Sequence, residues 1–219
     1  MEHRTLAGVI FDLDGTLLDS TAVWSQIDRT ILREHGIQPP AGLSDLVKKL
    51  SIAESSQYFI TQFGLPYTPE SFSRHVQELA AEQYQTTLLL KPHALELLND
   101  LDQKQIPYCV VTANYRTLAQ AALERLGLME RIAFLLTEQE AGATKTSPEI
   151  FRQAAAAMHL GRRQLVVAED SLHCIETAKQ AGFFTVGVYD AETAPEEWTK
   201  IQATATISVS DLQEMKTLF

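Results

Sequence analysis

The stretch LAGVIFDLDGT, residues 6–16, places two carboxylates directly after a short apolar run. The run at residues 6–11 has the length and composition of a buried β-strand. Asp12 and Asp14 follow it two residues apart, and Gly15 is a residue type that is common in turns. An Asp-x-Asp-Gly segment alone is as often a solvated turn as a functional site. Its meaning therefore depends on what the rest of the chain places beside it.

Further apolar runs of strand type alternate with helical patterns along the rest of the chain. The runs lie at residues 106–111, 132–136, 164–168, 184–189 and 204–209, and the helical patterns at 92–104, 115–126, 147–159 and 171–181. Such alternation is typical of βα units around a parallel sheet. The sequence therefore predicts an α/β fold: a Rossmann-like parallel sheet core with helices on both faces.

Residues 18–88 break this alternation and carry only helical patterns, at 23–34, 52–63 and 69–84. We interpret them as an inserted all-helical cap domain, with residues 1–17 and 89–219 forming the catalytic core. The insertion follows the first strand directly, so it is expected to cover the mouth of the sheet.

Composition limits the classes of function. The 219 residues are 45% hydrophobic and 21% charged, which is ordinary for a globular protein. The net charge of -10 argues against binding of nucleic acid or an anionic membrane. Cys109 and Cys174 belong to no metal-ligand or CxxC spacing. No signal peptide or membrane-spanning run is evident, so we expect a cytoplasmic location.

Polar residues immediately follow three of the predicted strands. Ligands of open parallel sheets bind beyond the carboxyl ends of the strands, so these residues should converge at one edge. They are Asp12, Asp14, Thr112, Ala113, Asn114, Glu169 and Asp170. Four converging carboxylates would repel one another without a cation, and hard oxygen ligands suit Mg²⁺.

Lys145 stands just ahead of Ser147, which can cap the helix that Pro148 begins. Its charge and the helix N-terminus would favour an anion at the same edge. Taken singly, Lys145 could be a surface lysine and Thr112 a strand end, while Ser171 could simply cap the next helix. In this order and together, they give the layout that a phosphate monoester requires.

These residues resemble the haloacid dehalogenase superfamily, in particular its phosphatase-like branch with a helical cap inserted after the first motif. That branch includes β-phosphoglucomutase and phosphoglycolate phosphatase. The motifs are residues 12–20, 110–114, 145–148 and 166–171, and the match covers nearly the whole chain. The third motif keeps the lysine but has Thr146 where a proline is frequent.

The resemblance implies that Asp12 attacks phosphorus and forms an aspartyl phosphate. Asp14 would protonate the leaving alcohol and then activate water. Magnesium would be held by Asp12, the Asp14 backbone carbonyl, Glu169 and Asp170. The phosphoryl oxygens would be bound by Thr112, Ala113 and Lys145.

The resemblance implies a phosphatase for a small phosphorylated metabolite, such as a sugar phosphate. A phosphomutase is the alternative, disfavoured because Trp24 and Ile52 stand where the mutase cap supplies histidine and arginine. Dehalogenases lack the second aspartate, so Asp14 disfavours them. A further alternative is a protein without catalytic activity, which would bind phosphate ligands or have a regulatory role.

Specificity for the leaving group is expected to come from residues near the cap and the second strand. Lys48 and Lys49 precede the helical pattern at 52–63, where they could enter the site, although a solvated face would explain them equally well. Asn114, next to the predicted phosphate-binding residues, is a third candidate.

Overall fold

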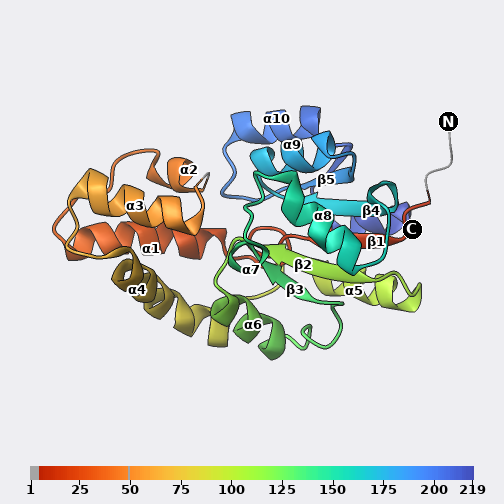
Figure 1. The fold of residues 1–219 in the computed structure, drawn as a ribbon, viewed down its shortest axis with the longest axis horizontal. Helices are drawn as coiled ribbons and strands as arrows, with labels where there is room; N and C mark the ends of the chain where they lie inside the picture. Colours follow the sequence, from red (N-terminus) through yellow and green to blue (C-terminus); the bar gives the residue numbers. More distant parts are fainter. Residues whose placement is uncertain (1–4, 49) are drawn as a thin grey trace.

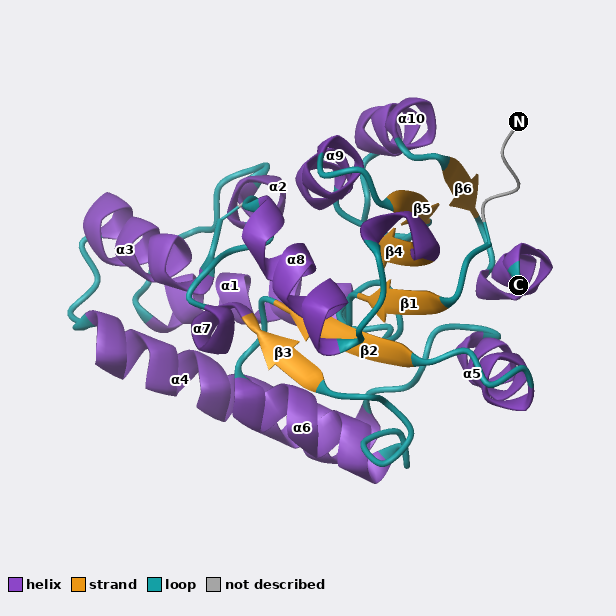
Figure 2. Cartoon of the chain, turned by 45° about the vertical axis from the view of Figure 1, so that its right-hand side comes forward, coloured by secondary structure: helices purple, strands orange, loops and turns teal. Residues whose placement is uncertain are grey.

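The computed structural model describes residues 5–48 and 50–219, and they contain a six-stranded parallel sheet of order β3-β2-β1-β4-β5-β6 (Figures 1 and 2). Its strands are β1 (Gly8–Phe11), β2 (Tyr108–Thr112), β3 (Leu135–Thr137), β4 (Leu165–Glu169), β5 (Phe184–Val188) and β6 (Ile207–Val209). The predicted fold class is confirmed. β3 and β6 begin later than predicted, because residues before each of them lie in loops or in a helix.

The central strand β1 pairs with β2 on one side and β4 on the other. All four of its residues are buried, as expected for a parallel strand covered on both faces. Phe11 is in register with Val110 of β2 and Ala168 of β4. The carboxyl ends of the three strands therefore lie side by side, at the edge where the predicted site residues follow.

Helices cover both faces of the sheet (Figure 2). Ile10 packs with α8 (Pro148–Ala157) and α9 (Leu172–Gln180), whereas Val9 and Phe11 face the opposite cluster. That opposite cluster includes residues of α5 (Ala94–Gln103), α6 (Arg116–Arg125) and the C-terminal 3₁₀ helix (Leu212–Leu218). The alternation follows from the two-residue period of a strand.

Helix α10 (Pro195–Thr204) was not expected from the sequence. Ile201 is its one buried residue and Trp198 is partly buried beside it, so the apolar stripe is too short to indicate a helical period. Ile201 packs where Gly187 of β5 has no side chain: a Cβ there would lie 2.5 Å from Ile201 Cγ2. The strand predicted at residues 204–209 was therefore too long, because Thr204 belongs to this helix.

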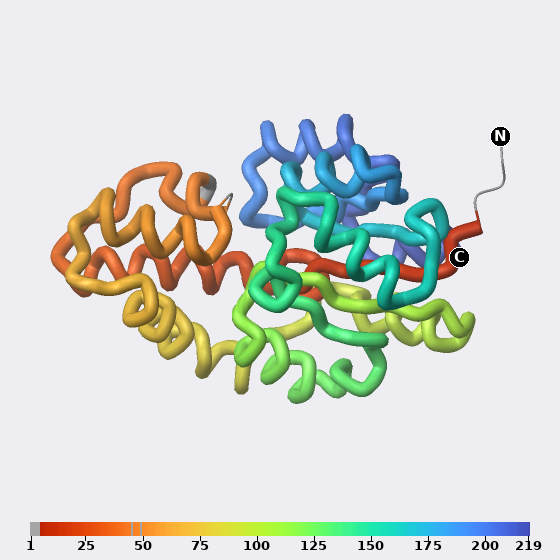
Figure 3. The backbone as a smooth tube through the Cα atoms, viewed as in Figure 1, coloured from red at the N-terminus to blue at the C-terminus, as the bar shows by residue number. Residues whose placement is uncertain are grey.

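Between β1 and α5 the chain forms the helical cap region (Figure 3). Its helices are α1 (Thr21–Glu34), α2 (Leu43–Val47), α3 (Ile52–Phe63) and α4 (Pro69–Glu82), followed by a π-helical turn (Gln83–Thr87). Capping boxes formed by Ser51 with Glu54, and by Thr68 with Ser71, fix where α3 and α4 begin. The boundaries 18–88 for the cap domain stay a prediction.

The two predicted caps of core helices behave differently. The Ser147 side chain accepts a hydrogen bond from the backbone N–H of Glu149 at 3.3 Å, with Pro148 in the first helical position. Ser171 makes no side-chain cap bond, so that prediction was wrong. Its backbone N–H donates to Glu169 Oε2 instead. Gly182 follows α9 with φ of +90°, the left-handed conformation that glycine commonly adopts at the end of a helix.

None of the helices in the described residues is both long enough and apolar enough to cross a membrane.

Candidate active site

Three carboxylates gather at the carboxyl ends of β1 and β4. Oxygen atoms of Asp12, Glu169 and Asp170 lie within 4.8 Å of one another, and all three residues are buried. Asp12 directly follows β1, and its backbone N–H donates to Ala168 O across the sheet at 3.0 Å. Three buried carboxylate oxygens at this spacing suit a hard divalent cation. The donor set therefore fits a metal site.

Lys145 lies against this cluster and is itself buried. Its Nζ is 2.5 Å from Asp12 Oδ1 and 2.5 Å from Glu169 Oε1. Burial opposes the charge on the amine, but the Asp12 and Glu169 carboxylates outweigh it and raise the pKa of Lys145 well above its usual range. The Lys145 backbone N–H donates to Glu138 Oε1 at 2.6 Å, which fixes the loop before α8.

Asp14 lies between the core and the cap. One carboxylate oxygen accepts hydrogen bonds from Ser20 Oγ at 2.6 Å, Trp24 Nε1 at 3.4 Å and the Tyr84 hydroxyl. The other accepts from Asn114 Nδ2 at 2.8 Å. Trp24 Nε1 is also 2.8 Å from the Tyr84 hydroxyl oxygen. Donors from several elements thus hold the carboxylate in one orientation.

Lys48 reaches from the cap to the core. Its Nζ is 2.9 Å from Asp170 Oδ2 and donates to Thr193 Oγ1 at 3.3 Å. Burial opposes its charge, but Asp170 outweighs burial and raises the pKa of Lys48 above its usual range. Of the two predicted cap lysines, Lys48 therefore enters the site. Lys49 lies outside the described residues.

The turn after Asp14 requires a glycine. Gly15 has φ of +85°, and a Cβ at this position would lie 2.7 Å from Asp170 Oδ2. Only a residue without a side chain lets the first motif approach the carboxylate after β4 so closely.

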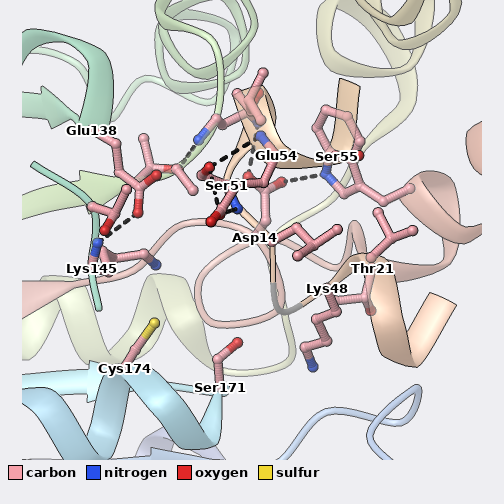
Figure 4. Close-up of a pocket in the computed structure, with 18 of the residues that line it drawn as sticks. Asp14, Thr21, Lys48, Ser51, Glu54, Ser55, Glu138, Lys145, Ser171 and Cys174 are labelled. Atoms are coloured by element: carbon pink, nitrogen blue, oxygen red, sulfur yellow. Dashed lines mark hydrogen bonds between the residues drawn. The ribbon is translucent and has the colours of Figure 1, made fainter. Parts of the chain in front are cut away.

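A cavity of about 240 Å³ lies between the carboxyl edge of the sheet and the cap (Figure 4). The core residues at its wall are Asp12, Asp14, Thr112, Ala113, Asn114, Lys145 and Asp170, and Lys48 lines it from the cap. The Thr112 hydroxyl accepts a hydrogen bond from the Asn114 backbone N–H at 3.0 Å. Glu169 does not line the cavity, but its carboxylate belongs to the acidic cluster with Asp12 and Asp170 and pairs with Lys145. The predicted site residues that the structure describes thus meet in one place.

Residues 9–188 match the family of haloacid dehalogenase-like hydrolases. The chain belongs to this family. The match covers β1 from Val9 onward, the sheet through β5 and the whole cap region, so it includes the residues named above as lining the cavity.

Curated relatives of this hydrolase include two phosphatases. It is 28% identical to validoxylamine A 7'-phosphate phosphatase from Streptomyces hygroscopicus over 210 residues, which are 94% of each chain. It is also 28% identical to N-acetylmuramic acid 6-phosphate phosphatase from Pseudomonas putida, over 88% of this chain and 86% of the relative. Family and relatives together place the chain among the haloacid dehalogenase-like phosphatases, which are phosphoric monoester hydrolases.

The fold is shared with β-phosphoglucomutase from Clostridium difficile. That crystal structure superposes with a TM-score of 0.75 at 23% identity and covers 96% of this chain and 93% of its own. The predicted resemblance to this branch of the superfamily, with its cap, is confirmed.

Several residues of the hydrolase's site were not predicted from the sequence. Tyr84 contacts Asp14 across 70 positions of sequence, and Glu138 contacts the Lys145 backbone from a short helix. Asp28 also lines the cavity, from α1. No spacing rule links Tyr84 to Asp14. Asp28, by contrast, falls on the same face of α1 as Trp24, which stands where the mutase cap supplies a histidine or an arginine, so helical spacing from Trp24 could have indicated it.

Proposed function

We propose that this hydrolase is a magnesium-dependent phosphatase that hydrolyses a small phosphorylated metabolite, similar to a sugar phosphate, through an aspartyl phosphate on Asp12. The observation that carries the proposal is the placement of Asp12, Asp14 and Lys145 around one capped cavity of about 240 Å³. Asp12 would be the nucleophile, Asp14 the acid and Lys145 the cation that binds the phosphate. All three line a cavity whose size suits a small leaving group.

The chain's own residues would divide the reaction between them. A carboxylate oxygen of Asp12 attacks phosphorus as the bond to the leaving oxygen breaks, and Asp14 gives that oxygen a proton. Asp14 then takes a proton from the water that attacks the aspartyl phosphate, which releases inorganic phosphate and restores Asp12. Lys145, the Thr112 hydroxyl and the backbone of Ala113 would hold the phosphoryl oxygens.

Magnesium would be bound by Asp12, Glu169, Asp170 and the Asp14 backbone carbonyl. When bound, it would shield the negative charge that otherwise keeps an anionic nucleophile away from an anionic phosphate. The buried cluster of three carboxylates supports this assignment.

The substrate class rests on the enclosure of the site and on the relatives. Trp24 and Lys48 of the cap line the same cavity as Asp12, so the leaving group would lie beneath the cap in a space of about 240 Å³, which suits a small molecule. The names of both curated phosphatases specify a phosphate on a small molecule. Asn114 and Lys48 would contribute to specificity as well as to positioning.

The test is phosphate release from a panel of phosphorylated metabolites with and without Mg²⁺. We expect turnover that requires Mg²⁺, and a loss of at least about a thousand-fold in Asp12→Asn, because the covalent route disappears. Asp19→Asn is the matched control, since Asp19 is an exposed carboxylate of the same motif. Undiminished activity of Asp12→Asn would rule out the mechanism.

The same panel separates the rival functions. A phosphomutase would require a bisphosphate activator and release little free phosphate. A non-catalytic protein would bind members of the panel without turning any of them over.

A further inference from the structure

One face of α1 forms part of the cavity wall. Thr21, Trp24, Ser25 and Asp28 all line the cavity, and their spacing of three, four and seven residues puts them on one side of the helix. Trp24 contacts Asp14 through its indole N–H. At 1.5 Å per residue, Asp28 lies about 6 Å further along the helix than Trp24. Asp28 is thus displaced from the acid by about one helical turn.

The Asp28 carboxyl has no hydrogen-bond or ion-pair partner among residues 5–48 and 50–219. Among the other carboxylates at the cavity wall, Asp12 pairs with Lys145, Asp170 with Lys48 and Glu54 with Ser51, whereas Glu192 is exposed to solvent. Burial raises the pKa of Asp28 to about 7, and only the charge of neighbouring Arg29 opposes this. A carboxyl that faces a cavity without a partner is costly unless a ligand satisfies it.

The cavity wall on the cap side is mixed in character. Phe72, Val76 and Ile52 contribute apolar surface, while Ser25 contributes a hydroxyl near Asp28. The cations Lys145 and Lys48 are both held at the core carboxylates. The cavity therefore has cations where the phosphate would lie and an unpaired carboxyl on the cap helix.

We propose that Asp28 binds the leaving group, and that the substrate is a phosphate monoester whose carbon skeleton carries a hydrogen-bond donor beyond the ester oxygen. This inference rests on the proposed function. The donor is a hydroxyl or a protonated amine, either of which satisfies a carboxyl group. A carboxylate or second phosphate at that place would be repelled by Asp28, so phosphorylated acids and bisphosphates are poor substrates.

The experiment compares kcat and KM for glucose 6-phosphate, glucosamine 6-phosphate, 6-phosphogluconate and para-nitrophenyl phosphate. The first two supply hydroxyl and amine donors, the third adds a carboxylate, and the last has no donor beyond the ester. Wild type, Asp28→Leu and Asp28→Asn are measured, with Asp19→Asn as the control carboxylate outside the cavity wall.

We expect Asp28→Leu to raise KM for the preferred sugar phosphate about ten-fold or more, which is the usual effect of losing one hydrogen bond to a charged or polar group. Para-nitrophenyl phosphate should change by less than about two-fold in every variant, because its ring offers Asp28 no donor. Asp28→Asn distinguishes the donors: an amide still accepts from a hydroxyl but loses the attraction for an ammonium.

Three results would overturn the inference. The first is a wild-type preference for 6-phosphogluconate over the neutral sugar phosphate. The second is a parallel loss on all four substrates in Asp28→Asn, which is nearly isosteric and would then reveal a purely structural role. The third is unchanged KM for every substrate in both Asp28 variants. Failure of the proposed function looks different: wild type would release no phosphate from any of the four compounds, para-nitrophenyl phosphate included.

Discussion

The Asp14 carboxylate receives hydrogen bonds from both halves of the molecule. Tyr84 and Trp24 donate from the cap side, and Asn114 donates from the end of β2. The orientation of the proposed acid and base therefore depends on where the cap lies. Tyr84 is fully buried, and burial followed by the nearby Asp14 raises its pKa well above the usual range, so its hydroxyl remains a donor.

Tyr84→Phe should lower kcat about ten-fold and leave KM within about three-fold, because the substrate still binds while Asp14 loses a positioning hydrogen bond. The measurement is steady-state phosphate release over a range of substrate concentrations, which gives kcat and KM separately. Tyr67→Phe is the matched control, since it removes a hydroxyl bonded to His35 elsewhere in the cap. Equal effects of both substitutions would mean that Tyr84 acts only through cap packing.

Asp28 makes stability depend on pH. Its pKa rises from the ordinary 3.8 to about 7 on folding, so between these values the folded chain holds a proton that the unfolded chain has lost. The stability that depends on a protonated Asp28 is fully present below about pH 4. It is lost as the pH rises to 7, which lowers the free energy of unfolding by at most about 4 kcal/mol.

Asp28→Asn cannot ionise, so it should escape this loss. Thermal unfolding should show similar midpoints for Asp28→Asn and wild type near pH 4, and a growing advantage for the variant up to about pH 7. A difference between the two midpoints that does not vary with pH would contradict the shift.

At the scale of elements, helix ends show where local sequence is sufficient. Ser147 and Pro148 form the start of α8 that their types predict. Ser171 has the same type and the same place before a helix, yet its side chain makes no cap bond. At this turn the Ser171 backbone N–H donates to the carboxylate of Glu169, which also pairs with Lys145 in the site. The turn is therefore held by Glu169 and not by the serine side chain.

Ser147→Ala should therefore cost about 1 kcal/mol of the free energy of unfolding, the typical value for a lost N-cap. Ser171→Ala should cost clearly less, because no cap bond is lost. Urea denaturation of both variants measures the difference. A larger loss in Ser171→Ala than in Ser147→Ala would show that the assignment of the two caps is reversed.

At the scale of the whole molecule, the cap is joined to the core by contacts around the site. Lys48 pairs with Asp170, and Arg125 of α6 donates to Tyr84 O at 3.2 Å and to Leu88 O. Thr117 of α6 also donates to Gln77 of α4 at 2.9 Å. Lys48 thus joins the cap directly to the acidic cluster of the core.

Lys48→Met should bind Mg²⁺ several-fold more tightly in the absence of substrate. The ammonium lies 2.9 Å from a proposed metal ligand, so it repels a cation bound there. Calorimetric titration with Mg²⁺ measures the change directly. Lys179→Met, which removes an exposed lysine from α9, serves as the control. Unchanged or weaker binding in Lys48→Met would exclude competition between lysine and metal.

The sequence by itself determined the α/β class, the order of the strands and of most helices, and the polar residues that end the strands. Each of these depends on local signals: apolar runs, caps, and a carboxylate or lysine directly after them. Only the tertiary structure decided that Tyr84 holds Asp14, that Lys48 meets Asp170 and that Asp28 faces the cavity unpaired. Those contacts join helices and strands far apart in the chain, and packing of the cap on the sheet, which no local period encodes, brings them together.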